Sequence, residues 1–203
     1  DGLGGGTPIE FTVTGQGGVP ASGVGAVSLN VTAVNTEAPN EGGYVTVYPC
    51  GTRPNASNLN FTSGQIIANA VIAPVSANGK VCFYVYGKAH LLADVNGWFA
   101  ESQGANSVTP ARLFDTRDGS GGVNASKVGD GLGGGTPIEF TVTGQGGVPA
   151  SGVGAVSLNV TAVDTEAPSE GGYVTVYPCG TRPNASNLNF TSGQIIPNAV
   201  IAP

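Results

Sequence analysis

The few charged residues of this sequence include a group whose spacing predicts an ion pair. Arg112, Asp115 and Arg117 alternate with mainly apolar residues, and Asp94 lies in another apolar run upstream. A charge that leaves water is stable only when an opposite charge pairs with it. Carboxylate and guanidinium groups make strong, charge-assisted hydrogen bonds. We therefore predict that these four residues form a partly buried structural ion pair.

Calcium binding is the alternative use of this segment. Its candidate ligands are Asp115, Asp118, Ser120 and Asp130. Oxygen atoms of this kind suit a hard cation, but the spacing matches no standard calcium loop. The ion pair is the favoured interpretation, and we expect no metal and no other cofactor.

The cysteines predict a disulfide once an internal repeat of 129 residues is taken into account. One period holds Cys50 and Cys82, and Cys179 is the counterpart of Cys50 in the next copy. The partner expected for Cys179 falls beyond the last residue, Pro203. We predict a Cys50–Cys82 bond, which would stabilise the unit by roughly 3–4 kcal/mol. Two reduced, buried thiols are the alternative, and a single histidine makes a zinc site a poor interpretation.

Glycosylation is the third chemistry that the residue types allow. Seven Asn-x-Ser/Thr sequons are present, at Asn30, Asn55, Asn60, Asn124, Asn159, Asn184 and Asn189. Each has the form that accepts an N-linked glycan on an exposed segment of a secreted protein. We expect Asn30, Asn60, Asn159 and Asn189 to face solvent. The alternative is that asparagine and threonine simply provide a neutral polar surface.

Residues able to catalyse a reaction are scarce. His90 is the only histidine and lies in a strand-like run, where a lone histidine is usually structural. No Ser/His/Asp or Cys/His combination can be assembled in each repeat. Gly-x-Gly-x-x-Gly spacings occur without the strand–helix unit that phosphate binding needs. We expect no catalytic residues, and a protein that is not an enzyme.

Composition limits the partners and the compartment. Lys and Arg number 7 against 13 Asp and Glu, which excludes the basic surface that nucleic-acid binding needs. No apolar run has the length of a membrane-spanning helix, so we expect no membrane insertion. No signal peptide is present, and the sequence begins with Asp and contains no Met. We expect a segment of a longer mature chain that is extracellular or on the cell surface.

The organisation is a tandem repeat. Residues 1–74 recur as 130–203 with three differences in 74 positions, namely Asn35 against Asp164, Asn40 against Ser169 and Ala68 against Pro197. A period of this size indicates whole domains in tandem. We expect a first repeat at 1–100, truncated at its N-terminus, and a join at 101–107. A second repeat, truncated at its C-terminus, would occupy 108–203.

The elements that position these residues are predicted to be strands throughout. Apolar and polar residues alternate in 9–14, 27–32 and 58–62, as in an antiparallel sheet with one wet face. Glycine- and proline-rich turns separate these segments. No segment has the apolar spacing of a helix. We predict an all-β fold of jelly-roll-like antiparallel β-sandwiches in tandem, with a small barrel as a further alternative.

The motifs of one period resemble a family of secreted bacterial repeats that is common in actinobacteria and their relatives. The motifs are Pro110–Arg117, Gly147–Pro149, Leu158–Ala162, Gly172–Gly180, Pro183–Phe190 and Asp94–Phe99. The resemblance covers essentially the whole period. It implies extracellular β-rich modules, some of them appended to secreted enzymes. A pure array is also similar to tandem β-domain filaments in which one unit donates a strand to the next.

Two functions follow from these features. The first is a structural subunit of an extracellular filament or cell-surface fibre, with neighbouring repeats or copies of itself as partners. A strand within 106–117 would then pair with both neighbouring units and cover their sheet edges. The second is a cell-surface adhesin or carbohydrate-binding array. Its candidate sugar platforms are the aromatic residues Tyr44, Tyr48, Tyr84, Tyr86 and Trp98.

Overall fold

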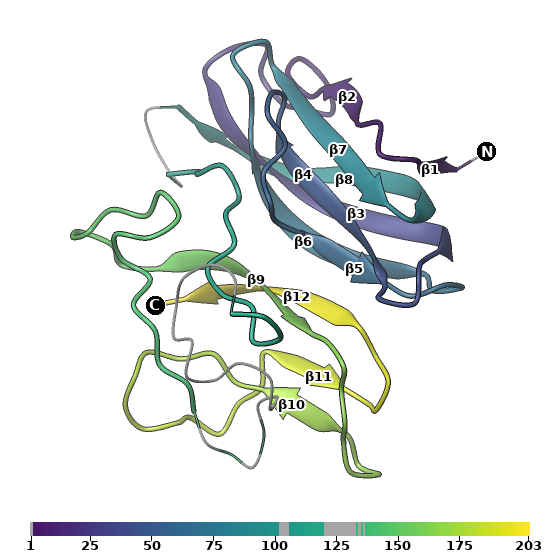
Figure 1. Ribbon diagram of the computed structural model, residues 1–203. Helices are drawn as coiled ribbons and strands as arrows, with labels where there is room; N and C mark the ends of the chain where they lie inside the picture. The colour runs from purple at the N-terminus through teal and green to yellow at the C-terminus, as the bar shows by residue number, and fades with distance from the viewer. Residues whose placement is uncertain (1, 102–105, 120–132, 134, 136) are drawn as a thin grey trace.

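The computed structural model describes residues 2–101, 106–119, 133, 135 and 137–203. Within these ranges the fold is all-β, and no helix is present. The prediction of antiparallel β-sandwich architecture is confirmed, because the strands of the first copy form two antiparallel sheets packed face to face (Figure 1).

The first copy is a sandwich of two four-stranded sheets. One sheet has the order β1 (Leu3–Gly4), β8 (Lys88–Ala100), β3 (Val24–Glu37) and β6 (Ile67–Pro74). The other has the order β2 (Ile9–Thr12), β7 (Lys80–Tyr86), β4 (Gly43–Pro49) and β5 (Leu59–Phe61). Strands β6 and β5 therefore lie at the edges of the two sheets.

The core of the first copy follows from the alternation along its strands. In β3 the side chains of Val27, Leu29 and Val31 are buried, while those between them are partly exposed. Val45 and Val47 of β4 meet them from the other sheet. Alternate residues of a strand point to opposite faces, so two such rows form one apolar layer between the sheets.

The second copy contains only part of this arrangement. β9 (Val156–Ala162) pairs with β12 (Ile196–Ala202), and β10 (Gly172–Val174) pairs with β11 (Leu188–Phe190). These pairs correspond to β3 with β6 and to β4 with β5 in the first copy. The sequence given holds no counterpart of β7 and β8 for this copy.

The strand expected within residues 106–117 is not formed, which corrects the prediction of strand exchange. The segment contacts both copies through side chains instead. The Ser107 hydroxyl lies 3.4 Å from the Gly25 carbonyl of the first copy, and the Phe114 ring lies 4.5 Å from that of Phe140 in the second. Pro110 has no N–H to donate to a ladder. In the second copy, residues 138–141, which correspond to β2, form no strand and so offer no sheet edge.

Candidate functional site: the junction between the copies

The two copies meet along the edge of the first sandwich. Strands β5 and β6 of the first copy face β9 and β12 of the second (Figure 1). Edge strands carry backbone and side-chain groups that no neighbouring strand satisfies. Here several polar groups at or beside this edge, among them the Ser57 carbonyl and the Asn60 and Asn69 side chains, bond to the other copy.

Asn69 is the centre of the junction. It lies on β6, on the inward-facing row with Val71 and Ala73, and is 4% exposed. Its amide nitrogen donates to the Asn58 carbonyl at 2.6 Å and to the Asn159 side-chain oxygen at 2.8 Å. Its own oxygen accepts from the Ala199 backbone N–H at 2.9 Å. One buried amide thus bonds a side chain and a backbone group of the second copy, both on strands.

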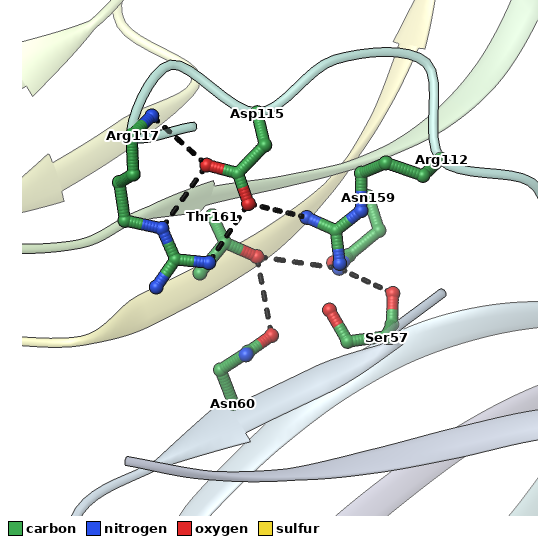
Figure 2. A network of polar contacts seen from close by, with 7 residues as sticks. All are labelled: Ser57, Asn60, Arg112, Asp115, Arg117, Asn159 and Thr161. Carbon is green, nitrogen blue, oxygen red and sulfur yellow. Dashed lines mark hydrogen bonds and ion pairs between the residues drawn. The ribbon is translucent and has the colours of Figure 1, made fainter. Parts of the chain in front are cut away.

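Three more groups extend this contact across β5 (Figure 2). Asn159 donates to the Ser57 carbonyl at 2.8 Å. The Thr161 hydroxyl donates to the Asn60 side-chain oxygen at 3.2 Å. Asn159 and Thr161 are also joined to each other at 3.4 Å. Because Asn159 and Thr161 alternate along β9, their side chains project from the same face and reach the first copy together.

Ile195 adds an apolar contact to the polar junction. A Cβ atom built on Gly42 would lie 2.6 Å from the Ile195 Cδ1, so the isoleucine occupies the space that a larger residue would fill. Gly42 also has a φ of 92°, which favours glycine. The corresponding isoleucine of the first copy, Ile66, is 78% exposed. The junction therefore shields one isoleucine of the pair.

The predicted charged cluster lies beside the junction. Arg117 donates through Nε and Nη2 to the two oxygens of Asp115, at 3.0 and 2.8 Å (Figure 2). Arg112 approaches the same carboxylate at 3.6 Å. The Asp115 side chain is 10% exposed. Hydrogen bonding from Arg117, with smaller contributions from the charge of both arginines, lowers the pKa of Asp115 to about 2.

The fourth residue of the predicted cluster lies elsewhere. Asp94 is exposed on β8, opposite Asn30 of β3. Asp94 is flanked by apolar residues, which favours a partly buried position, but in the structure it is exposed. The ion pair is therefore made by Arg112, Asp115 and Arg117.

The geometry of Asp115 favours the ion pair over the calcium alternative. Both oxygens of Asp115 are already bonded to guanidinium groups, so they are not free to bind a cation. Ser120 and Asp130 lie outside the described residues. Among the described residues, the group of possible metal ligands that come together is Glu10 with Cys50 and Cys82, whose sulfur atoms are bonded to each other.

The charged cluster and the first copy enclose a cleft of about 310 Å³. Its walls include Glu41, Tyr44 and Tyr86 from the first copy, Asp115 and Arg117 from the connecting segment, and Thr161 and Ile195 from the second copy. The Tyr86 hydroxyl donates to the Glu41 carboxylate at 2.7 Å. This bond lowers the pKa of Glu41 and raises the pKa of Tyr86.

Three tyrosines form a ladder on the outer face of the second sheet. Tyr44 of β4 stacks on Tyr86 of β7 with ring centroids 5.2 Å apart, and Tyr84 lies 6.0 Å from Tyr44. The Arg53 guanidinium lies 4.1 Å above the Tyr84 ring, within the range of a cation–π contact. Tyr48, another candidate sugar platform, is only 1% exposed. Trp98 is exposed on β8.

The predicted disulfide is confirmed. Cys50 and Cys82 are bonded, with Cα atoms 4.9 Å apart. Antiparallel pairing of β4 with β7 places Tyr48 opposite Cys82, so Cys50 follows just beyond the end of the ladder. Cys179 is exposed and has no disulfide partner among the described residues.

The sequons divide into exposed and contacting positions. Asn55, Asn184 and Asn189 are exposed, whereas Asn30 is half-buried. Asn60 and Asn159, expected to face solvent, are half-buried and bonded across the junction. Asn124 lies outside the described residues. The one histidine, His90, is exposed on β8.

Sequence reasoning missed the two residues on which the junction most depends. Asn69 is a polar residue at an inward position of a strand whose other inward residues are apolar. A polar residue at such a position indicates that its side chain has a specific hydrogen-bonding partner. Ile195 and its counterpart Ile66 follow a glycine-containing turn, with nothing in the pattern to show which isoleucine is covered.

No family model, curated protein or solved structure matches the chain. Among the described residues, no helix is long and apolar enough to cross a membrane. The disulfide is consistent with an oxidising compartment, as for a secreted protein.

Proposed function

We propose that the protein is a structural subunit of an extracellular filament or cell-surface fibre, in which β-domains follow one another along the chain in a fixed orientation. The observation that carries the proposal is the junction, where buried Asn69 binds both a side chain and a backbone N–H of the next copy. A fibre needs such contacts, because units joined only by a linker rotate freely.

The junction consists mainly of hydrogen bonds, and such a contact fixes the relative orientation of the two copies more than it strengthens their association. Hydrogen bonds across it are directional, and each buried group has to be satisfied in one geometry. Ile195 against Gly42 adds a contact that tolerates little displacement, since a Cβ at that position would clash. The combination holds one relative orientation of the copies rather than a range of them.

The sequence offers no set of residues that could form a catalytic site, which agrees with a structural role. The single histidine is exposed on a strand, and the perturbed carboxylate, Asp115, is neutralised by two arginines. An acid held at a pKa of about 2 is a permanent anion at neutral pH and does not exchange protons there. Its role is to fix the connecting segment beside the junction.

A second candidate function is carbohydrate binding by an adhesive array. The tyrosine ladder of Tyr44, Tyr84 and Tyr86 is half-buried, and two of its members, Tyr44 and Tyr86, line the cleft, where aromatic faces could stack on sugar rings. The same stacking also stabilises the sheet as cross-strand pairs. The tyrosine ladder is therefore weaker support for carbohydrate binding than the junction is for a structural filament.

Electron microscopy of the native material in negative stain tests the proposal. A filament of fixed units gives stiff fibres with a uniform repeat along their length. A flexible adhesin gives beads whose spacing and direction vary from particle to particle, and that result would contradict the proposal. Binding of soluble glycans that is lost in Tyr86→Ala but kept in Asn69→Ala would favour the adhesive function instead.

A further inference from the structure

We propose that the molecule carries both halves of a second, unoccupied junction and binds a second copy of this chain head to tail. One half, the Ile66 surface, consists of Asn30, Thr32, Ile66 and Ala70 of the first copy. The other half, the Asn198 surface, consists of Gly171, Ser186, Asn189 and Asn198 of the second copy. The inference rests on the junction that supports the proposed function and names the partner of that contact.

The repeat assigns these surfaces residue by residue. Within the chain, the second copy uses Asn159, Thr161, Ile195 and Ala199, which correspond to the Ile66 surface at an offset of 129. The first copy uses Gly42, Ser57, Asn60 and Asn69, which correspond to the Asn198 surface. The residues that bind each other inside the chain are thus present a second time, and no group of the described residues covers them as the junction does.

The Asn198 surface already has the conformation of its occupied counterpart. The Asn198 amide donates to the Asn187 carbonyl at 2.5 Å, as Asn69 does to Asn58 at 2.6 Å. This bond directs the amide in the same way, yet Asn198 is exposed whereas Asn69 is 4% exposed. A pre-organised group loses little entropy on binding.

The position that receives the isoleucine is open. At Gly42 a Cβ atom would lie 2.6 Å from Ile195, whereas at Gly171 the one neighbour that it would meet is the Phe190 carbonyl at 3.3 Å. Gly171 has a φ of 95°, close to the 92° of Gly42. The local backbone is therefore the same, and only the incoming side chain is missing.

The Ile66 surface is equally prepared. Asn30 donates to the Thr32 hydroxyl at 3.4 Å, the distance of the Asn159–Thr161 bond in the junction. Ala70 lies on β6, the edge strand of its sheet, and β8 pairs with β3 on the side opposite β6. The outer edge of β6 therefore stays free although β8 is part of the same sheet. Ile66 is the most exposed large apolar side chain of the described residues.

The two surfaces differ from each other and lie on different copies, so the contact is heterologous. Such contacts do not saturate in a two-fold dimer and extend into open chains unless the rotation closes a ring. A molecule docked on the Ile66 surface offers its own Ile66 surface to the next. The geometry gives end-to-end growth in addition to the repeat along the chain.

Sedimentation velocity from about 1 µM to about 1 mM tests the inference, since a small interface gives affinities in this range. A Cys179→Ser background prevents disulfide-linked dimers through the exposed thiol. We expect the mean mass to rise with concentration from the 20.0 kDa monomer and to pass the dimer value. Ile66→Asp should weaken this association at least tenfold. Phe11→Asp, which alters another exposed apolar side chain on β2, an edge strand of the other sheet, should leave it unchanged.

A mixing experiment distinguishes the two surfaces. Ile66→Asp and Asn198→Ala variants each keep one intact surface, so neither should form chains alone, and their mixture should form dimers and stop there. A wild-type protein that stays monomeric throughout, or an Ile66→Asp variant that associates like the wild type, overturns the inference. Monomers with a fixed orientation of the two copies would leave the proposed function standing, whereas freely moving copies would remove both.

Discussion

The two copies of the repeat have almost the same sequence and different structures. Val45 and Tyr48 of the first copy are buried, whereas their counterparts Val174 and Tyr177 are half-exposed. Three substitutions in 74 positions, none of them at these sites, do not explain this change. The burial of a side chain in this fold therefore depends on the strands that pair with its own strand, and not only on the sequence of that strand.

The strand lengths show which partners matter. Strand β3 has 14 residues and its counterpart β9 has 7, while β4 has 7 and β10 has 3. In contrast, β5 and β11 both have 3 residues, and β6 and β12 have 8 and 7. β3 and β4 pair with β8 and β7, whose counterparts fall outside the sequence given, whereas β5 and β6 pair only with strands that are described in both copies. The strands of the second copy are shorter where the counterpart of a partner strand lies beyond Pro203.

Several side-chain hydrogen bonds are the same in the two copies. The Thr36 hydroxyl donates to the Thr62 carbonyl at 2.8 Å, and Thr165 repeats the bond to Thr191 at 2.8 Å. Thr46 and Thr175 likewise each donate to an alanine carbonyl at 2.6 Å. Hydrogen bonds between segments that are present in both copies are thus the same, and the pairing with β7 and β8 distinguishes the copies.

The largest expected difference between the copies lies in their cores. Phe61 is fully buried and Phe190 is half-buried. Phe61→Ala should lower the free energy of unfolding by about 3–5 kcal/mol, because it removes a packed ring and leaves a cavity. Phe190→Ala should cost less than half of that. Urea denaturation of both variants, followed by circular dichroism, measures the two costs, and equal values would contradict the comparison.

The disulfide gives the next largest contrast. Replacing Cys50 and Cys82 together by Ser should cost roughly 3–4 kcal/mol, because the unfolded chain regains the freedom of the closed loop. Cys179→Ser is the matched control and should be neutral, since this thiol is exposed and unbonded. Thermal unfolding of the three proteins gives the comparison. A double variant as stable as the wild type would mean that the bond contributes nothing to the sandwich.

The junction provides a contrast between two asparagines. Asn69→Ala removes a buried amide that satisfies groups of the other copy, and should cost about 1–3 kcal/mol. Asn198→Ala changes an exposed counterpart and should cost less than about 0.5 kcal/mol in dilute solution. Hydrogen exchange should also show faster exchange of the Ala199 N–H in the Asn69 variant alone. Similar effects of the two substitutions would show that the junction does not order the copies.

The smallest expected effect is a pH dependence that belongs to the connecting segment. The pKa of Asp115 is lowered from 3.8 to about 2, so its contribution to stability is present above pH 4 and is lost as the pH falls through about 2. This contribution is on the order of 1–2 kcal/mol. The stability difference between the wild type and Asp115→Asn should shrink between pH 5 and pH 2.5. A difference that stays constant would show that the carboxylate is not held by the arginines.

Much of this could be predicted from the sequence, because the predictable parts depend on local patterns. Alternation fixed the inward row of β3, and the repeat identified Cys50 and Cys82 as partners in one period. The charge pattern found Asp115 and its arginines but also included Asp94, since spacing does not show which face a residue occupies. The junction could not be derived in this way. It joins Asn69 to Asn159 across 90 residues and depends on how two folded units pack.

The central claim is that the two copies hold one orientation through the junction. Spin labels at Cys179 and at Ser22→Cys, both exposed positions on different copies, report their separation through pulsed electron–electron distance measurement. The account predicts a single narrow distance distribution in the labelled parent protein, broadened when Asn69→Ala and Ile195→Asp are introduced together. A broad distribution in the parent protein, unchanged by these substitutions, would contradict it.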